Sequence, residues 1–341
     1  MIHILLIGAG TMGSVHAHAY SKMSNVKLVG IVDIRQEAKE LCSAVNAQYF
    51  SSYEEAVKQL QQMDAVDVCV PTYLHKFYVK QAADGGKHVI CEKPLAGNLQ
   101  DAREMIDYCQ AQQVHLYVGH VLRFFPEYVE AKRVIDRGGI GKTAVVRTSR
   151  VAGFPMGWND WYADAQKSGG AALDLIIHDF DFLRWCYGEV ERVFAKGLSG
   201  RELARKDYAL VTLRFKNGVI AHVEGSWSHQ AFTMKFEIAG TTGIIDYDSA
   251  KDSSIYWSKE NGQSGGKDVS VPESPLQTTP YARELEHFIS CMETGSKPVV
   301  TAEDAYSALE ISLAAIESMK TARPVTLPFE QTVVQSGGNR V

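Results

Sequence analysis

Short apolar runs alternate with helical patterns over the first 120 residues. The apolar runs predict strands at 2–7, 27–32, 65–70, 87–91 and 115–118, with a short one near 47–50. Helical spacing predicts helices between them, at about 12–22, 36–45, 53–61, 75–84 and 99–112. Alternation of this kind favours a parallel sheet wrapped by helices. We therefore expect residues 1–120 to form one α/β domain.

The pattern changes after His120. A helical segment is followed by strand patterns at 143–151, 192–197, 208–215, 219–227 and 234–238, and then by helical stretches at 280–293 and 302–321. We expect residues 121–330 to form an α+β domain with a mainly antiparallel sheet, which binds substrate and mediates oligomerisation. Residues 249–279 read as an exposed loop, and residues 331–341 as a frayed tail.

A hairpin in this second domain bears on the oligomeric state. Asn217-Gly218 joins two strand-like runs, which is a strong hairpin signal. Neither face of the hairpin is cleanly polar, so we expect one face to pack on helices and the other partly on a partner subunit. That arrangement predicts a homodimer or homotetramer formed through the sheet. The alternative is a sheet that is covered by the loop at 249–279.

The first strand leads into a glycine-rich turn. The segment Gly8-Ala9-Gly10-Thr11-Met12-Gly13 has the spacing Gly-x-Gly-x-x-Gly and precedes a predicted helix. The first glycine permits a tight turn, the second admits a pyrophosphate, and the third lets helix pack on strand. The diphosphate would lie at the positive end of the helix. This context predicts a Rossmann dinucleotide-binding domain, whereas the glycines alone would fit an ordinary strand–turn–helix.

The end of the second predicted strand bears on the choice of cofactor. Asp33 can accept hydrogen bonds from both ribose hydroxyls and would repel a 2′-phosphate, which favours NAD. Arg35 lies two residues further on and could bind that phosphate instead, so NADP stays open. Ile34 lies between them and is expected to contact the cofactor as well.

The bulk composition narrows the class of protein. Apolar residues make up 45% of the 341-residue chain and charged residues 22%, as in a globular protein, and the net charge of −5 gives no basic surface for nucleic acid. No apolar run is long enough for a membrane span.

The six cysteines are dispersed without a Cys-x-x-Cys motif, and no signal peptide precedes the first strand, so we expect a cytoplasmic protein. His16 and His18 would point to different helix faces, and we expect no metal.

Two constellations carry candidate chemistry. The first is Cys91-Glu92-Lys93-Pro94 at the end of a predicted strand, where the charge of Lys93 could stabilise alkoxide character as a hydride leaves. The alternative is a surface lysine at a strand end. Ligands of parallel sheets bind beyond the carboxyl ends of the strands, so we also expect contacts from Pro71, Thr72, Glu92 and His120.

The second constellation lies in the segment from Gly169 to Asp181. Asp174 and His178 stand four residues apart and would share one face of a helix. Histidine suits general acid–base chemistry near neutral pH, and Asp174 could orient it. The alternative is a polar seam on an ordinary helix.

Taken together, these motifs resemble the Gfo/Idh/MocA family, named for glucose–fructose oxidoreductase, inositol dehydrogenase and a rhizopine-catabolism protein. The resemblance covers nearly the whole chain and is carried by the glycine fingerprint, Glu92-Lys93-Pro94, Arg123-Phe124-x-Pro126 and Gly169 to Trp185. It implies that Lys93, Asp174 and His178 are a catalytic trio, with His178 taking the hydroxyl proton. It also implies that Thr72 and His75 lie beside the nicotinamide.

The walls of a substrate site are harder to read. Arg123 and His120 lie near the crossing between the domains, where they could reach substrate and cofactor or pack at the hinge. Asn159 and Trp161 belong to a polar-aromatic loop that would suit a sugar ring, or would anchor the loop. His229 follows a strand and could line the same pocket.

We therefore expect an NAD-dependent dehydrogenase that oxidises a secondary hydroxyl of a cyclic polyol or sugar. Two alternatives stay open at this point. One is an NADPH-dependent ketosugar reductase, and the other is a non-catalytic regulator that senses NAD or sugar on the same fold. The intact trio of Lys93, Asp174 and His178 counts against the regulator, because a sensor needs no proton relay.

Overall fold

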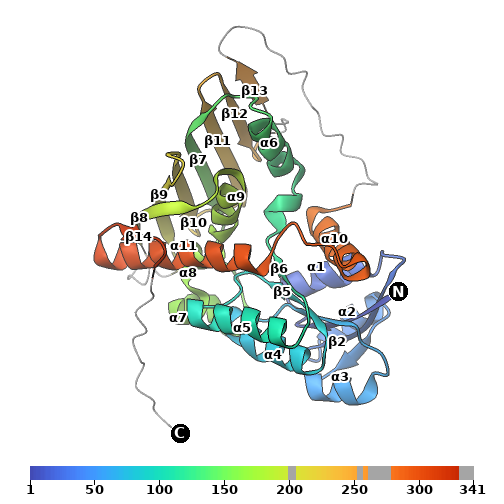
Figure 1. The fold of residues 1–341 in the computed structure, drawn as a ribbon. Helices are drawn as coiled ribbons and strands as arrows, with labels where there is room; N and C mark the ends of the chain where they lie inside the picture. The colour runs from blue at the N-terminus through green and yellow to red at the C-terminus, as the bar shows by residue number, and fades with distance from the viewer. Residues whose placement is uncertain (199–204, 252–255, 260–277, 330–341) are drawn as a thin grey trace.

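The first sheet of the molecule is parallel and has six strands. In a computed structural model that describes residues 1–198, 205–251, 256–259 and 278–329, its order is β3-β2-β1-β4-β5-β6 (Figure 1). The strands are β1 (Ile2–Ile7), β2 (Val26–Val32), β3 (Gln48–Phe50), β4 (Ala65–Val68), β5 (His88–Glu92) and β6 (Leu116–Gly119). This is the strand order of a dinucleotide-binding Rossmann domain, so the predicted fold class of the first domain is confirmed.

Helices cover both faces of this sheet. They are α1 (Thr11–Tyr20), α2 (Ala38–Ala44), α3 (Tyr53–Gln59), α4 (His75–Asp84) and α5 (Leu99–Ala111), with a 3₁₀ turn η1 (Thr72–Leu74) before α4. Alternate residues of β1 point to opposite sides: Leu5 packs in the core beneath α4 and α5, and Leu6 in the core beneath α1 and α2. Strands buried on both faces explain the continuous apolar runs in the sequence.

The second sheet has eight strands in the order β13-β12-β11-β7-β10-β9-β8-β14. The strands are β7 (Thr143–Val151), β8 (Val190–Leu198), β9 (Tyr208–Phe215), β10 (Ile220–Ser226), β11 (Thr233–Gly240), β12 (Gly243–Asp248), β13 (Tyr256–Lys259) and β14 (Val325–Thr326). Only β7 and β10 run parallel, and the other described pairs are antiparallel, which confirms the predicted sheet type.

The sequence patterns did not predict β12, β13 or β14. Strand β13 lies inside the predicted loop 249–279, most of which is outside the described residues, as is the predicted tail 331–341. One face of the sheet packs on helices: Val211 and Leu213 share a core with Phe180 and Ile311. The opposite face exposes Leu210, at 43% of its surface.

The remaining helical segments connect the two sheets. They are η2 (Val121–Phe124), α6 (Pro126–Asp136), η3 (Trp158–Ala163), α7 (Ala165–Ser168), α8 (Gly170–Asp174), α9 (Ile177–Tyr187), α10 (Pro280–Thr294) and α11 (Ala302–Thr321). The chain returns to the first sheet at its end, because α10 packs on α1 through Leu285 and Phe288 (Figure 1). Helix α11 runs between the two sheets and joins their cores (Figure 1).

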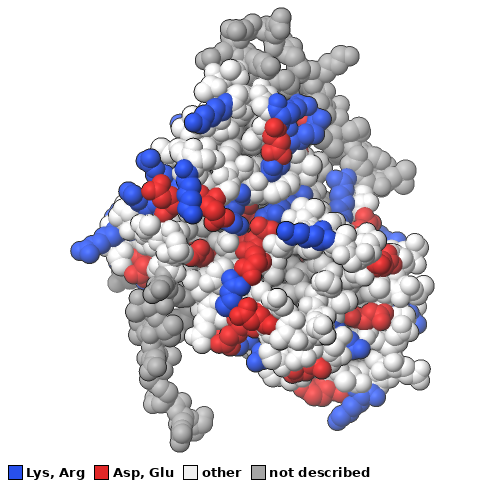
Figure 2. All heavy atoms as spheres, in the orientation of Figure 1, with Lys and Arg blue, Asp and Glu red and all other residues white. Residues whose placement is uncertain are grey.

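Two surface properties are relevant to function. Figure 2 shows acidic and basic side chains interspersed on the face that it draws, without a broad area of one sign. In the described part of the chain, no helix is long and apolar enough to cross a bilayer.

Candidate active site

The glycine turn is built as the fingerprint requires. Gly8 has φ +98°, and a Cβ there would lie 2.4 Å from the carbonyl oxygen of Cys69. A Cβ on Gly13 would lie 1.8 Å from the carbonyl oxygen of Gly8. A Cβ on Gly10, by contrast, would meet nothing within 4 Å, and no side chain caps α1 at Gly10. The first amides of α1, from Thr11 and Met12 onward, are therefore available to an anion such as a diphosphate.

Asp33 lies at the end of β2, and its carboxylate is held on both oxygens. The amide of Ala9 donates to Oδ2 at 2.8 Å, and the Arg35 guanidinium donates to Oδ1 at 2.9 Å and to Oδ2 at 2.7 Å. Burial alone would raise the pKa of Asp33, but these bonds lower it overall. Ile34 is 65% exposed beside them. Arg35 thus neutralises the charge that would repel a 2′-phosphate.

Pro71, Thr72 and His75 follow β4 at the same edge of the sheet. The His75 ring is buried, with Nδ1 3.0 Å from the carbonyl oxygen of Pro94 and Nε2 2.9 Å from that of Val70. His75 therefore ties the loop after β5 to the loop after β4.

The predicted lysine and aspartate meet across the two domains. Lys93 follows β5, and its ammonium donates to Asp174 Oδ1 at 3.1 Å and to the Asp174 carbonyl oxygen at 2.8 Å. Both side chains are mostly buried, at 15% and 14% exposure. An ammonium has three N–H donors, so this pairing leaves one for another acceptor.

His178 lines the same cavity as this pair, and its side chain is partly buried. Its Nδ1 has no hydrogen-bond partner in the described part of the chain. Burial, together with the positive charges of Lys93 and Arg150, lowers the pKa of His178 well below its ordinary value. The ring of His120 lies 6.3 Å away, fully buried, and burial lowers its pKa too. A neutral imidazole can accept a proton at neutral pH.

The predicted single helix around Asp174 and His178 is wrong. Helix α8 ends at Asp174, and α9 begins at Ile177. The i,i+4 spacing therefore does not place them on one helix face. They come together because a break at residues 175–176 turns both toward the same cavity.

That cavity has a volume of about 130 Å³ and is lined by Lys93, Asp174 and His178 from both parts of the molecule. Its other walls are formed by Val121, Leu122, Phe125, Arg150, Leu175, Phe232 and Tyr281. No motif in the sequence predicts Arg150 or Tyr281 at the site. One feature of the sequence could have indicated Arg150: it is a charged residue at an alternate, inward position of β7, on the same face as Val146 and Thr148. A charge at such a position needs a partner or a function.

Four predicted substrate residues lie outside the lining of this cavity. Arg123 is buried in a bidentate ion pair with Asp181 at 2.6 and 2.9 Å. Trp161 stacks on Tyr162 with ring centroids 4.0 Å apart. The other two are Asn159, which has φ +51° in η3, and His229, which is exposed.

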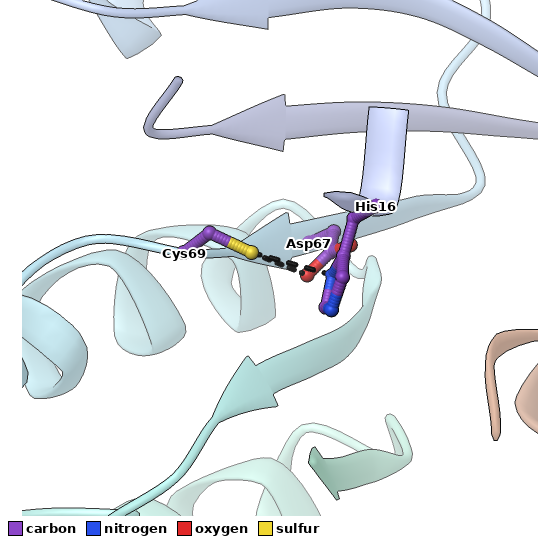
Figure 3. A group of neighbouring side chains, drawn as sticks. All are labelled: His16, Asp67 and Cys69. Atoms are coloured by element: carbon purple, nitrogen blue, oxygen red, sulfur yellow. Dashed lines mark hydrogen bonds and ion pairs between the residues drawn. The ribbon is translucent and has the colours of Figure 1, made fainter. Parts of the chain in front are cut away.

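Beneath the strand ends, the structure also assembles a polar group that the sequence did not indicate. His16, Asp67 and Cys69 lie together on the α1 side of the sheet, and Figure 3 shows their side chains converging. His16 Nδ1 is 2.8 Å from Asp67 Oδ2. Metal ligands at about 2.0–2.3 Å from an ion are separated by roughly 3.3 Å or more. The shorter contact is that of a direct hydrogen bond.

The fold and this site define a two-domain oxidoreductase with an NAD-binding Rossmann domain. A family model described as "Oxidoreductase family, NAD-binding Rossmann fold" matches residues 2–120, and one for the GFO/IDH/MocA C-terminal domain matches residues 128–246. The chain therefore belongs to the Gfo/Idh/MocA family, and the predicted family, enzyme class and cofactor are confirmed.

Named relatives match over almost the full length of the chain. It is 32% identical to a myo-inositol 2-dehydrogenase of Thermotoga maritima over 338 residues, covering 96% of this chain and 98% of that protein. It is 29% identical to a scyllo-inositol 2-dehydrogenase (NAD(+)) of Bacillus subtilis, covering 97% of each. A solved structure of a probable dehydrogenase from Thermotoga maritima aligns with a TM-score of 0.80 at 30% identity, covering 95% of this chain and 98% of that one.

Proposed function

We propose that this protein is an NAD-dependent dehydrogenase that oxidises a secondary hydroxyl of a cyclic polyol or sugar, either inositol-like or an aldose. The observation that carries the proposal is the convergence of Lys93, Asp174 and His178 on one cavity at the carboxyl edge of the Rossmann sheet. The similarity to two inositol 2-dehydrogenases supports the substrate class.

The cofactor would lie along the carboxyl edge of the first sheet. When bound, its nicotinamide ring supplies the hydride acceptor. We propose that the residues contacting it are Gly8, Gly10, Thr11, Met12, Gly13, Asp33, Ile34, Arg35, Pro71, Thr72, His75, Glu92, Lys93 and His120. The open space at Gly10 and the uncapped start of α1 support this placement.

In the proposed reaction, the substrate hydroxyl binds between Lys93 and His178. His178 is neutral because of its lowered pKa, and it accepts the hydroxyl proton. Lys93 donates its remaining N–H to the same oxygen and stabilises the negative charge that develops as the hydride leaves. Asp174 holds the ammonium at that position through two contacts.

The cavity walls indicate how a polyol would be held. Arg150 pairs with Asp179 at 2.6 Å, so its charge is balanced and the site suits a neutral, hydroxyl-rich ligand. Tyr281 and Phe232 offer aromatic surface to the apolar face of a ring. We propose Arg150 as a substrate contact beside the trio. Arg123, Asn159, Trp161 and His229 are not part of this proposal, since they lie outside the cavity lining.

The test is turnover with a panel of inositols and aldoses, followed by NADH absorbance. We expect at least one inositol or aldose to reduce NAD. We expect Lys93→Ala and His178→Ala each to lower kcat by about 10²-fold or more. Lys58→Ala, at an exposed helix position, is the matched control and should keep the full rate. Full activity in either active-site variant on an accepted substrate would show that the roles are misassigned.

One observation favours the reverse reaction with NADPH as a second candidate. The pairing of Arg35 with Asp33 removes the charge that would exclude a 2′-phosphate. Comparing the affinities for NADH and NADPH separates the two candidates. A preference for NADPH together with ketosugar reduction would favour the reductase.

We also propose a homo-oligomer formed through the exposed face of the second sheet, where Leu210 and Ile220 lie uncovered at 43% and 36%. A cytoplasmic setting is part of the proposal, supported by six cysteines that are all free thiols. A mass measurement in solution tests the oligomeric state.

A further inference from the structure

A buried polar network lies directly behind the catalytic lysine. Asp67 occupies an inward position of β4 and is fully buried. Its Oδ2 accepts a hydrogen bond from the Tyr20 hydroxyl at 2.8 Å and contacts His16 Nδ1 at 2.8 Å. The Sγ of Cys69 lies 3.3 Å from the same ring nitrogen (Figure 3). One nitrogen of His16 is therefore committed to Asp67.

The other nitrogen of His16 faces the loop that carries Lys93. His16 Nε2 lies 3.2 Å from Glu92 Oε1, at ion-pair distance. The second oxygen of Glu92 accepts the backbone N–H of Lys93 at 3.1 Å. The Lys93 side chain then continues to Asp174. An unbroken series of contacts thus runs from Asp67 through His16 and Glu92 to the cavity.

The charges in this network require a cation at its centre. Asp67 and Glu92 are both buried, and a buried carboxylate must be paired. Burial alone would lower the pKa of His16, but Cys69 and Asp67 raise it well above its ordinary value. A protonated ring donates a hydrogen bond from Nδ1 to Asp67, and its positive charge attracts Glu92, whose Oε1 lies at ion-pair distance from Nε2 without hydrogen-bond geometry. In the same way, His16 and Lys93 lower the pKa of Glu92 against the effect of burial.

Other titratable groups surround His16. From the elements packed against it they are Tyr20 on α1, Asp67 and Cys69 from β4 and the residue after it, Glu92 on β5, and Tyr281 and Glu284 on α10. Burial and the neighbouring Glu92 raise the pKa of Glu284 well above its usual range, which favours its neutral form. The two remaining carboxylates, Asp67 and Glu92, are then balanced by His16 together with Lys93.

The backbone of β6 also accommodates Glu92. A Cβ on Gly119 would lie 3.3 Å from Glu92 Oε1, so a side chain there would press on the carboxylate. Two features thus fix the position of Glu92: Gly119 leaves room for its carboxylate, and the charge of His16 attracts it.

We propose that His16 is a positioning residue for the reaction. Its imidazolium holds the Glu92 carboxylate so that Glu92 fixes the backbone of Lys93 and keeps the Lys93 ammonium on Asp174. The role of His16 in turnover rests on the proposed function. Its role in holding the Lys93 backbone does not, and the two can be measured separately.

The test compares His16→Gln with Tyr20→Phe. A glutamine amide cannot bridge both carboxylates, whereas Tyr20→Phe removes one bond to Asp67 and leaves the contact between His16 and Glu92 intact. Hydrogen exchange of the Lys93 backbone amide is measured by mass spectrometry in each full-length variant. The measurement does not require that a substrate be known. We expect about tenfold faster exchange in His16→Gln and less than about twofold change in Tyr20→Phe.

Kinetics supply the second measurement. With an accepted polyol, kcat of His16→Gln should fall about tenfold while KM for NAD stays within about twofold, because the glycine turn and Asp33, which lie outside the network, keep their contacts with the cofactor. If no polyol is turned over, the proposed function fails, and the exchange experiment still decides the positioning role. Exchange of the Lys93 amide at the same rate in both variants overturns the inference.

Glu92→Gln serves where His16→Gln does not fold, since it removes the ion pair and leaves His16 balanced by Asp67. We expect several-fold faster Lys93 exchange in this variant. Exchange at the wild-type rate would overturn the inference as well.

Discussion

Two ion pairs tie the segments at the carboxyl edge of the first sheet to helices α8 and α9, and they differ in how far their charges are satisfied. Arg123 and Asp181 are 3% and 0% exposed, and the guanidinium also donates to the carbonyl oxygen of Val299. Lys93 and Asp174 lie at the cavity, and the ammonium keeps one N–H free of this pairing.

The difference between these two ion pairs shows that an ion pair between the domains can either stabilise the structure or bind a ligand. A fully bonded, buried pair has no capacity for a ligand, and breaking it leaves a charge without compensation. A pair with a spare donor beside a cavity can bind a substrate oxygen. We infer that Arg123 and Asp181 fix the geometry of the domains, and that Lys93 and Asp174 use that geometry for chemistry.

The largest expected effect is on stability, at Asp181. Asp181→Asn leaves the buried Arg123 charge poorly compensated, and we expect the free energy of unfolding to fall by about 3–5 kcal/mol. Urea denaturation followed by circular dichroism measures it. The same substitution at Asp174 is the matched control and should cost clearly less, because the Lys93 ammonium still donates to the Asp174 carbonyl oxygen and borders the cavity. Equal losses at the two positions would remove the distinction between the pairs.

The second effect is on turnover, at Asp174. Asp174→Asn weakens the hold on the Lys93 ammonium, and we expect kcat to fall by about 10- to 100-fold with KM for NAD little changed. Steady-state NADH formation with an accepted polyol measures it. A variant whose kcat matches that of the wild type would contradict the role of this pair.

The smallest effect is a pH dependence set by His178. The lowered pKa of His178 means that the ring is neutral, and able to accept a proton, throughout the range above the ordinary pKa of about 6.5. The fraction of neutral ring decreases only as the pH falls through this lowered pKa. We expect kcat at pH 6.5 to stay within about 20% of its value at pH 8, where an unshifted histidine would give about half. An acid limb centred at or above pH 6.5 would argue against His178 as the base.

The first domain could be predicted from the sequence almost element by element. Continuous apolar runs bounded by glycines identify strands buried on both faces, and Gly8, Gly13 and Asp33 lie where the fingerprint implies. The first domain is predictable because its site depends on local structure: the end of each parallel strand determines where the following residue lies. The same logic predicted Lys93 at the sheet edge.

The second domain was predicted less well, because its site depends on contacts between distant segments. Arg150, Phe232 and Tyr281 come from a strand, a loop and the helix that returns to the first domain. No local pattern links them. A charge near a cleft suggests binding, which predicts Arg123 as a substrate residue, whereas its partner Asp181 lies 58 positions away and satisfies the charge. The break between α8 and α9 was also missed, since the apolar spacing continues across it.

The most direct test of the central claim is the structure of the wild-type protein with NADH and an accepted polyol. The account predicts the reacting hydroxyl oxygen within about 3.2 Å of both Lys93 Nζ and a ring nitrogen of His178, with Asp174 still bonded to Lys93. A polyol bound away from this cavity, or a Lys93 side chain turned away from that oxygen, would contradict it.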